Sequence, residues 1–147
     1  MMPMTEAFSW VEPDTDSLKR ILRETRSVAI VGASDKRTRP SYNVWTYLKL
    51  YSVYDLYLVN PALSEVDGAR VYPSLAELPV VPDLVHVFRR YDELPPVLDE
   101  TIEIGAKTIW LPDWSWHGQV ARAGEAAGLQ VVMDRSLQVE HTRLVRV

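Results

Sequence analysis

The fold is decided by one short segment, Ser27-Val28-Ala29-Ile30-Val31-Gly32. It is apolar, rich in β-branched residues and ends on glycine, which predicts a strand buried on both faces, as in a parallel sheet. A polar loop covers residues 33–39. Pro40 then suits the first turn of a helix, because its missing N–H costs nothing there. The segment therefore predicts a strand, a tight turn at glycine and a helix.

The same alternation of strands and helices continues along the chain. Further strands are predicted over residues 55–60, 69–72, 83–88, 107–111 and 129–133. Helices are predicted from Asp14 or Asp16 to about Thr25, over residues 40–51, 95–104 and 115–127, briefly after Ser74, and for a turn or two at the end of the chain. We therefore predict an α/β fold, a single Rossmann-like domain with a mostly parallel sheet of about 5–6 strands and helices on both faces.

Length and composition limit the alternatives. The chain has 147 residues, 47% of them apolar and 24% charged, which is typical of one globular domain. We take residues 1–13 as a loose lead-in and residues 14–147 as the domain. No signal sequence or membrane-length apolar run stands out, so a cytoplasmic location is expected. The absence of cysteine excludes disulfides, thiolate metal sites and cysteine nucleophiles.

The ends of the strands are where a ligand is expected, because ligands of open α/β sheets bind beyond the carboxyl ends of the strands. After the first strand, Lys36, Arg37 and Arg39 stand against one nearby acid, Asp35. The net charge of the chain is −4, which disfavours nucleic acid as a partner but leaves this loop as a local positive site suited to phosphate. The alternative is a solvated, arginine-rich loop.

Two further strand ends narrow the ligand class. Asn60, followed by Pro61, stands where an NAD enzyme would need an acid, and no G-x-G-x-x-G or phosphate-loop motif is present. NADP remains open because of the basic loop. Phe88 ends the fourth predicted strand and Arg89 and Arg90 follow it, where an aromatic ring and guanidinium groups suit a purine and a phosphate. The alternative is a core phenylalanine with a surface arginine.

Taken together, these strand ends resemble the small stand-alone CoA-binding proteins, which are related to the CoA-binding domain of the succinyl-CoA synthetase alpha subunit. The resemblance covers roughly residues 14–144 and lies in the order and spacing of several pieces. The pieces are Val28-Ala29-Ile30-Val31-Gly32-Ala33-Ser34, Arg39-Pro40-Ser41-Tyr42, Val59-Asn60-Pro61, Val71-Tyr72-Pro73-Ser74-Leu75, Asp83-Leu84-Val85, Val87-Phe88-Arg89, Trp110-Leu111 and Val131-Val132-Met133-Asp134-Arg135.

The resemblance implies a site for coenzyme A or an acyl-CoA. Its candidate cofactor-binding residues are Gly32, Ala33, Ser34, Lys36, Arg37, Arg39, Pro40, Ser41, Tyr42, Asn60, Pro61, Phe88, Arg89 and Trp110. The glycine end of the loop would approach the pyrophosphate, and Lys36 and Arg37 would lie near the phosphates, the 3′-phosphate included. Residues 40–42 would shape the start of the helix, and residues 60–61 and 88–89 would border the adenosine and pantetheine path. On general grounds Trp110 is a core residue.

Four positions depart from the family pattern. Pro112 replaces a usual glutamine, Asp113 a frequent glycine and Ser136 a usual cysteine, and Val53 replaces the glycine before the second strand. We predict a binding protein with no catalytic residues and no metal site. The alternatives are an NADP-linked oxidoreductase and an acyl-CoA-dependent transferase, for which His117 is the candidate base. Trp114 and Trp116 suggest a lid or an oligomer contact, so a homo-oligomer or a protein partner stays open. Asp134-Arg135 is interpreted as an internal ion pair.

Overall fold

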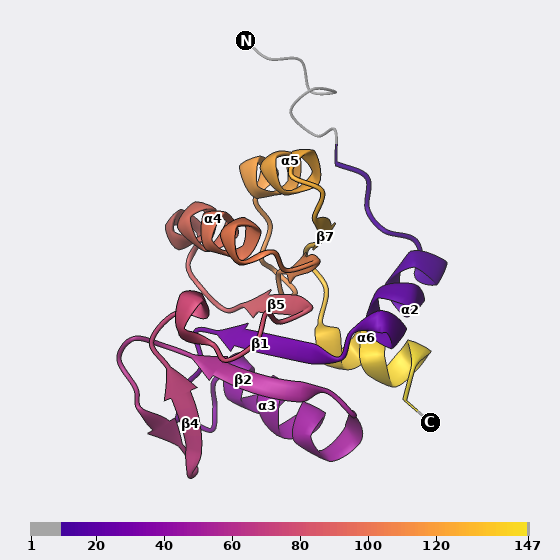
Figure 1. Cartoon of the computed structure of the whole chain (residues 1–147). Helices are drawn as coiled ribbons and strands as arrows, with labels where there is room; N and C mark the ends of the chain where they lie inside the picture. The colour runs from indigo at the N-terminus through magenta and orange to yellow at the C-terminus, as the bar shows by residue number, and fades with distance from the viewer. Residues whose placement is uncertain (1–9, 147) are drawn as a thin grey trace.

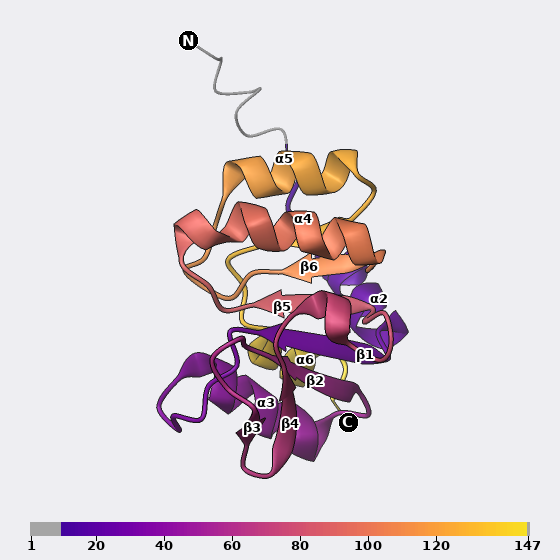
Figure 2. The same cartoon turned by 60° about the vertical axis from the view of Figure 1, so that its left-hand side comes forward.

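Seven strands form one sheet in a computed structural model that describes residues 10–146. The strands are β1 (Ser27–Val31), β2 (Asp55–Val59), β3 (Glu65–Val66), β4 (Ala69–Tyr72), β5 (Leu84–Val87), β6 (Thr108–Trp110) and β7 (Gln130–Val132). Their order in the sheet is β3-β4-β2-β1-β5-β6-β7 (Figures 1 and 2). β3 pairs antiparallel with β4, and the other pairs are parallel. The strand order therefore reverses direction around β1, at the centre of the sheet.

Helices cover both faces of the sheet. They are α2 (Thr15–Glu24), α3 (Pro40–Tyr51), α4 (Leu94–Ile104), α5 (Gly118–Ala126) and α6 (Leu137–Leu144), with 3-10 turns η1 (Leu75–Glu77) and η2 (Tyr91–Glu93). α2, α3 and α6 pack in one layer of the core and α4 and α5 in the other (Figures 1 and 2). Among residues 10–146, no helix has the length and apolar content needed to span a membrane.

The pleat of β1 explains the two layers. Val28 and Ile30 point into the layer of α2, α3 and α6, while Ala29 and Val31 point into the layer of α4 and α5. All four are at most 5% exposed. Successive side chains of a strand face opposite sides of the sheet, so a strand with a helix on each side must be apolar throughout. The predicted α/β Rossmann-like fold with helices on both faces is confirmed.

Three local features differ from the sequence prediction or add to it. β3 was not predicted, because a strand of two residues, Glu65 and Val66, leaves no apolar run to detect. α5 begins at Gly118 and not at Ser115, because the Nδ1 atom of His117 accepts the N–H of Val120 and so caps the helix there. Seven strands form in place of the expected five or six.

The end of the predicted lead-in is attached to the edge of the sheet. The indole N–H of Trp10 donates to the carbonyl of Val131 in β7 at 3.1 Å, and Glu12 pairs with Arg135. β7 is an edge strand, and the indole occupies one of its outward-facing carbonyls. The rest of the predicted lead-in, residues 1–9, lies outside the described residues.

Candidate functional site

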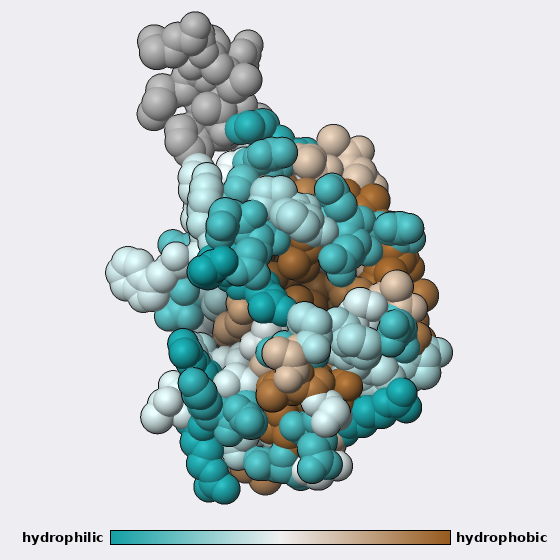
Figure 3. All heavy atoms as spheres, turned by 90° about the vertical axis from the view of Figure 1, so that its left-hand side faces the viewer, coloured by the Kyte–Doolittle hydropathy of each residue, from teal (hydrophilic) through white to brown (hydrophobic). Residues whose placement is uncertain are grey.

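A cleft of about 680 Å³ lies at the carboxyl ends of the central strands. Figure 3 views the molecule from the side to which the arrow of β1 points in Figure 1, and hydrophobic surface lies in the middle of this face between hydrophilic residues. The cleft is formed by the residues that follow β1, β2, β5 and β6. Its lining residues are Gly32, Ala33, Ser34, Asp35, Lys36, Arg39, Pro40, Ser41, Asn60, Ala62, Leu63, Phe88, Arg89, Arg90 and Pro112.

The floor of the cleft is the turn at Gly32. Its φ is +89°, in the left-handed region that favours glycine. A Cβ atom here would lie 2.1 Å from the carbonyl oxygen of Phe88, so the neighbouring strand leaves no room for a side chain. The N–H groups of Gly32 and Ala33 both donate to the carbonyl of Val59, at 3.0 and 3.2 Å. These donors are occupied, so an anion in the cleft must be bound by other groups.

The start of α3 supplies such groups. Arg39 is the N-cap residue, its side chain makes no capping hydrogen bond, and Pro40 takes the first helical position. The first intrahelical bond runs from the N–H of Asn43 to the carbonyl of Arg39, which leaves the N–H groups of Ser41 and Tyr42 without an intrahelical partner. The first turn carries no acid, so the positive end of the helix dipole faces an anion unopposed.

Two cations stand beside this helix end. Lys36 and Arg39 line the cleft and are exposed, and no ion pair joins either to a carboxylate within residues 10–146. The loop that carries them is held in shape by two bonds, from the N–H of Lys36 to Ser34 Oγ and from the N–H of Arg39 to the carbonyl of Lys36, both 3.0 Å. Arg37 is exposed and lies outside the lining residues.

Asn60 holds two loops of the cleft together. Its Nδ2 donates to the carbonyl of Ala33 at 2.7 Å, and its Oδ1 accepts the N–H of Ala62 at 2.8 Å. The amide therefore joins the loop after β1 to the loop after β2, which explains why an amide and not an acid serves here. Pro61, next to it, is exposed and does not line the cleft.

The residues after β5 form the opposite wall. The ring of Phe88 lies 4.3 Å from the ring of His86, centre to centre, and packs against the core. Arg89 lines the cleft and lies 3.7 Å from Glu93, whose other oxygen accepts from Nε of Arg90 at 2.8 Å. The wall therefore offers the apolar ring of Phe88 beside the guanidinium group of Arg89, which is restrained by the long ion pair with Glu93.

Two of the predicted site residues make internal contacts in place of lining the cleft. Trp110 is fully buried, and its indole N–H donates to the carbonyl of Arg135 at 2.8 Å. Tyr42 lies beside the cleft and donates its hydroxyl to Asp67 at 2.5 Å. The structure places the other predicted residues, apart from Arg37 and Pro61, in the lining of one cleft.

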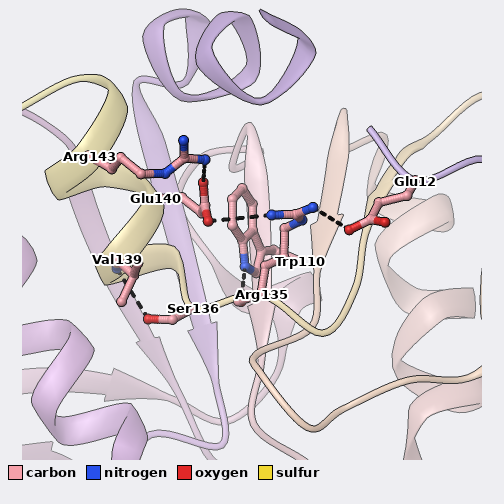
Figure 4. Close-up of polar contacts among 7 residues, drawn as sticks. All are labelled: Glu12, Trp110, Arg135, Ser136, Val139, Glu140 and Arg143. Carbon is pink, nitrogen blue, oxygen red and sulfur yellow. Dashed lines mark hydrogen bonds and ion pairs between the residues drawn. The ribbon is translucent and has the colours of Figure 1, made fainter. Parts of the chain in front are cut away.

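Arg135 is part of a different ion-pair network from the one expected. Figure 4 shows its guanidinium group between Glu12 and Glu140, with Glu140 also pairing with Arg143 at 2.6 Å. Asp134 does not take part, because its Oδ1 accepts the N–H of Trp114 at 2.7 Å. The interpretation of Asp134-Arg135 as an ion pair is wrong, since a left-handed backbone at Asp134 (φ +55°) directs its carboxylate to the neighbouring loop.

Each histidine has a structural contact. Burial lowers the pKa of His86 to about 4, and the hydrogen bond from its Nδ1 to the carbonyl of Trp110 opposes this shift without cancelling it. Burial and then the charge of Arg122 lower the pKa of His117, which caps α5 and stacks on Tyr91. Burial and then the charge of Arg146 lower the pKa of His141, whose Nδ1 contacts the hydroxyl of Tyr47 at 2.8 Å. Within the described residues, no group of three or more His, Asp or Glu is placed to hold a metal ion.

Five lining residues are not among the predicted site residues. Asp35, Arg90 and Pro112 lie in the loops after the first, fourth and fifth predicted strands, where the sequence already directs attention, although none of the three was assigned to the ligand. Ala62 and Leu63 give no such signal, because their position depends on the path of the chain from β2 into β3.

Trp114 stands exposed in the loop after β6, the loop that also contains the cleft residue Pro112. It is 94% exposed and has a φ of +67°, and the loop is held by bonds from its N–H to Asp134 and from the N–H of Asp134 to the carbonyl of Ser115 at 3.0 Å. A left-handed backbone costs about 1 kcal/mol or more for a residue with a Cβ. We therefore expect Trp114→Gly to be about 1 kcal/mol more stable than Trp114→Ala in urea unfolding. Equal stability of the two variants would show that the backbone here is unstrained.

Comparisons with known proteins agree on one family. A family model for a CoA binding domain matches residues 26–142. The protein YneT of Bacillus subtilis is 31% identical over 129 residues, which are 88% of this chain and 95% of YneT. A solved structure of a hypothetical protein from Pyrococcus horikoshii has a TM-score of 0.86 at 29% identity and covers 99% of this chain and 97% of its own. The alpha subunit of ADP-forming acetate–CoA ligase II of Pyrococcus furiosus is 32% identical over 84 residues, 57% of this chain and 18% of the ligase subunit.

Proposed function

The chain belongs to the family of CoA-binding domains, and from this premise we propose that it binds coenzyme A or an acyl-CoA in the cleft at the carboxyl ends of β1, β2 and β5. The observation that carries the proposal is the meeting of two unpaired cations, Lys36 and Arg39, with the uncapped start of α3. Coenzyme A carries a pyrophosphate and a 3′-phosphate, and such groups bind where backbone N–H donors and cations converge.

The remaining parts of the cleft suit the rest of the molecule. Phe88 and Leu63 offer apolar surface on which an adenine ring or the pantetheine chain can pack, and Arg89 offers a further cation. Asn60 acts in this proposal through the two loops that it joins, and its amide leaves no negative charge near the phosphates. These roles agree with the adenosine and pantetheine path that the sequence places along residues 60–61 and 88–89.

The proposed activity is binding and not catalysis by this chain. A transferase would need a base near the ligand, and His117, the candidate, has its Nδ1 occupied by the N–H of Val120 and its ring stacked on Tyr91, 4.2 Å away. The basic loop would also suit the 2′-phosphate of NADP, which makes NADP the second ligand to test. Incubation with acyl-CoA or NADPH, followed by assay for free CoA or oxidised cofactor, checks turnover directly.

Titration calorimetry with CoA, dephospho-CoA and NADP tests the proposal. We expect CoA to bind, and Arg39→Ala and Lys36→Ala each to weaken it roughly ten- to a hundredfold, because a charge-assisted hydrogen bond is worth about 1.5–3 kcal/mol. Arg37→Ala should have a smaller effect, since Arg37 lies outside the lining residues. Arg23→Ala, on the exposed side of α2, is the matched control and should leave the affinity unchanged.

The outcomes separate the ligands. CoA that does not bind at millimolar concentration would overturn the proposal, and tighter binding of NADP would replace the ligand. Equal affinity for CoA and dephospho-CoA would show that the 3′-phosphate is not read by this loop.

A further inference from the structure

We infer that Tyr42 is a positioning residue that fixes the width of the cleft by joining the start of α3 to the tip of the β3–β4 hairpin, an inference that rests on the proposed function. The observation is the hydrogen bond from the Tyr42 hydroxyl to Oδ2 of Asp67, 2.5 Å long. We call this bond the Tyr42–Asp67 latch. It lies beside the cleft, and neither partner lines it.

The two elements that the latch joins carry different parts of the cleft lining. Pro40 and Ser41, in the first turn of α3, line one side, directly before Tyr42. Ala62 and Leu63 line another side and lead directly into β3, at whose end Asp67 stands. A movement of the hairpin away from α3 would therefore carry residues 62–63 with it and widen the cleft.

The hairpin has few other ties to the sheet. β3 pairs only with β4, and β4 pairs with β2 at two positions, Leu58 with Val71 and Val59 with Tyr72. Both positions lie toward the end of β4, whereas the turn that contains Asp67 is at the opposite end of the hairpin, which lies at one side of the sheet (Figure 2). Val66, the residue directly before Asp67, is 1% exposed and packs in the core, so the latch adds a polar tie to a hairpin tip that one apolar side chain also anchors.

The local backbone directs both partners. Asp67 has a φ of +48° and Gly68 a φ of +82°, the signs expected for the two-residue turn that Asp-Gly favours in hairpins. The ring of Tyr42 packs edge-on against Trp45, with centres 5.8 Å apart, which fixes the direction of the hydroxyl. The bond to Asp67 also raises the pKa of Tyr42, and the charge of Arg37 opposes this, so the hydroxyl keeps its proton and donates at neutral pH.

The test compares variants of the latch in binding and in hydrogen exchange. Tyr42→Phe removes the hydroxyl and keeps the ring, and we expect it to weaken CoA roughly five- to tenfold, as suits the loss of one bond to a charged group at a partly exposed site. Amide hydrogens of residues 62–69 should exchange faster in the ligand-free variant. Asp67→Asn keeps an oxygen that accepts the hydroxyl and should retain most of the affinity, while Asp67→Ala should behave like Tyr42→Phe.

Tyr51→Phe is the matched control, because Tyr51 is at the other end of the same helix, beyond the cleft. It should leave binding and exchange unchanged. Wild-type affinity in Tyr42→Phe, or unchanged exchange of residues 62–69, would overturn the positioning role. If the wild-type chain binds no CoA, the proposed function fails, while exchange in the ligand-free variants still decides whether the latch holds the hairpin.

Discussion

Gly32→Ala is expected to destabilise the protein by about 4 kcal/mol and to abolish binding in the cleft. The new Cβ would meet the carbonyl oxygen of Phe88 at 2.1 Å, and backbone of a neighbouring strand cannot rotate away as a side chain can. Overpacking of a core costs about 1–3 kcal/mol, and the left-handed backbone adds about 1–2 kcal/mol. Denaturant unfolding measures the first effect, and calorimetry with CoA measures the second.

Gly105 provides the matched control for this variant. Its φ is +82°, close to that of Gly32, but a Cβ added there meets no atom within 4 Å. Gly105→Ala should therefore cost only the backbone term, about 1–2 kcal/mol, and leave the affinity for CoA unchanged. If Gly32→Ala and Gly105→Ala lose the same stability, the contact with Phe88 is not what requires glycine.

Acid should destabilise the protein by about 3 kcal/mol through His86 alone. Burial lowers the pKa of His86 to about 4 in the folded chain, against an ordinary value of 6.5, so the unfolded chain binds this proton first. The contribution of neutral His86 is therefore complete above pH 6.5, falls as the pH drops from 6.5 to 4, and is lost below 4. His117 and His141 shift in the same direction and add to the loss. Urea unfolding at a series of pH values between 7 and 4 measures this slope.

His86→Asn distinguishes His86 from the other groups. An asparagine amide can donate to the carbonyl of Trp110, as Nδ1 of His86 does at 3.0 Å, but it does not titrate. The variant should be less stable at pH 7, because a smaller side chain leaves a cavity, yet its stability should fall less steeply toward pH 4. Parallel pH profiles for the two proteins would show that His86 is not protonated on unfolding.

The sheet could be predicted because each main strand is a short apolar run with a polar loop after it. β1 shows this most clearly, since both its faces are buried and no polar residue interrupts it from Val28 to Val31. β3 could not be predicted in this way, because two residues form a strand only when β4 is beside them. β3 is in the sheet because the course of the chain brings its two residues beside β4, and not because those residues have a strong propensity for strand structure.

The same distinction applies to the cleft. Lys36, Arg39 and Phe88 could be predicted because they follow strands whose carboxyl ends meet at one edge of the sheet. The roles of Asn60 and Tyr42 could not be predicted, because each depends on a hydrogen bond to a residue far away in the sequence. Asn60 bonds to Ala33, and Tyr42 bonds to Asp67. Position in the chain indicates that a residue is near the cleft, but only the packed structure shows what its polar atoms bind.

Within residues 10–146, the first and last helices are α2 and α6, which pack together on one face of the sheet, and neither contributes a residue to the cleft. Circular permutation is therefore compatible with this architecture. A linker from α6 back to α2 would cross a surface outside the cleft. New termini could open at Val80-Val81, an exposed connector before β5, at the opposite edge of the sheet from the cleft. Fluorescent reporters fused at those termini would leave the entrance to the cleft clear.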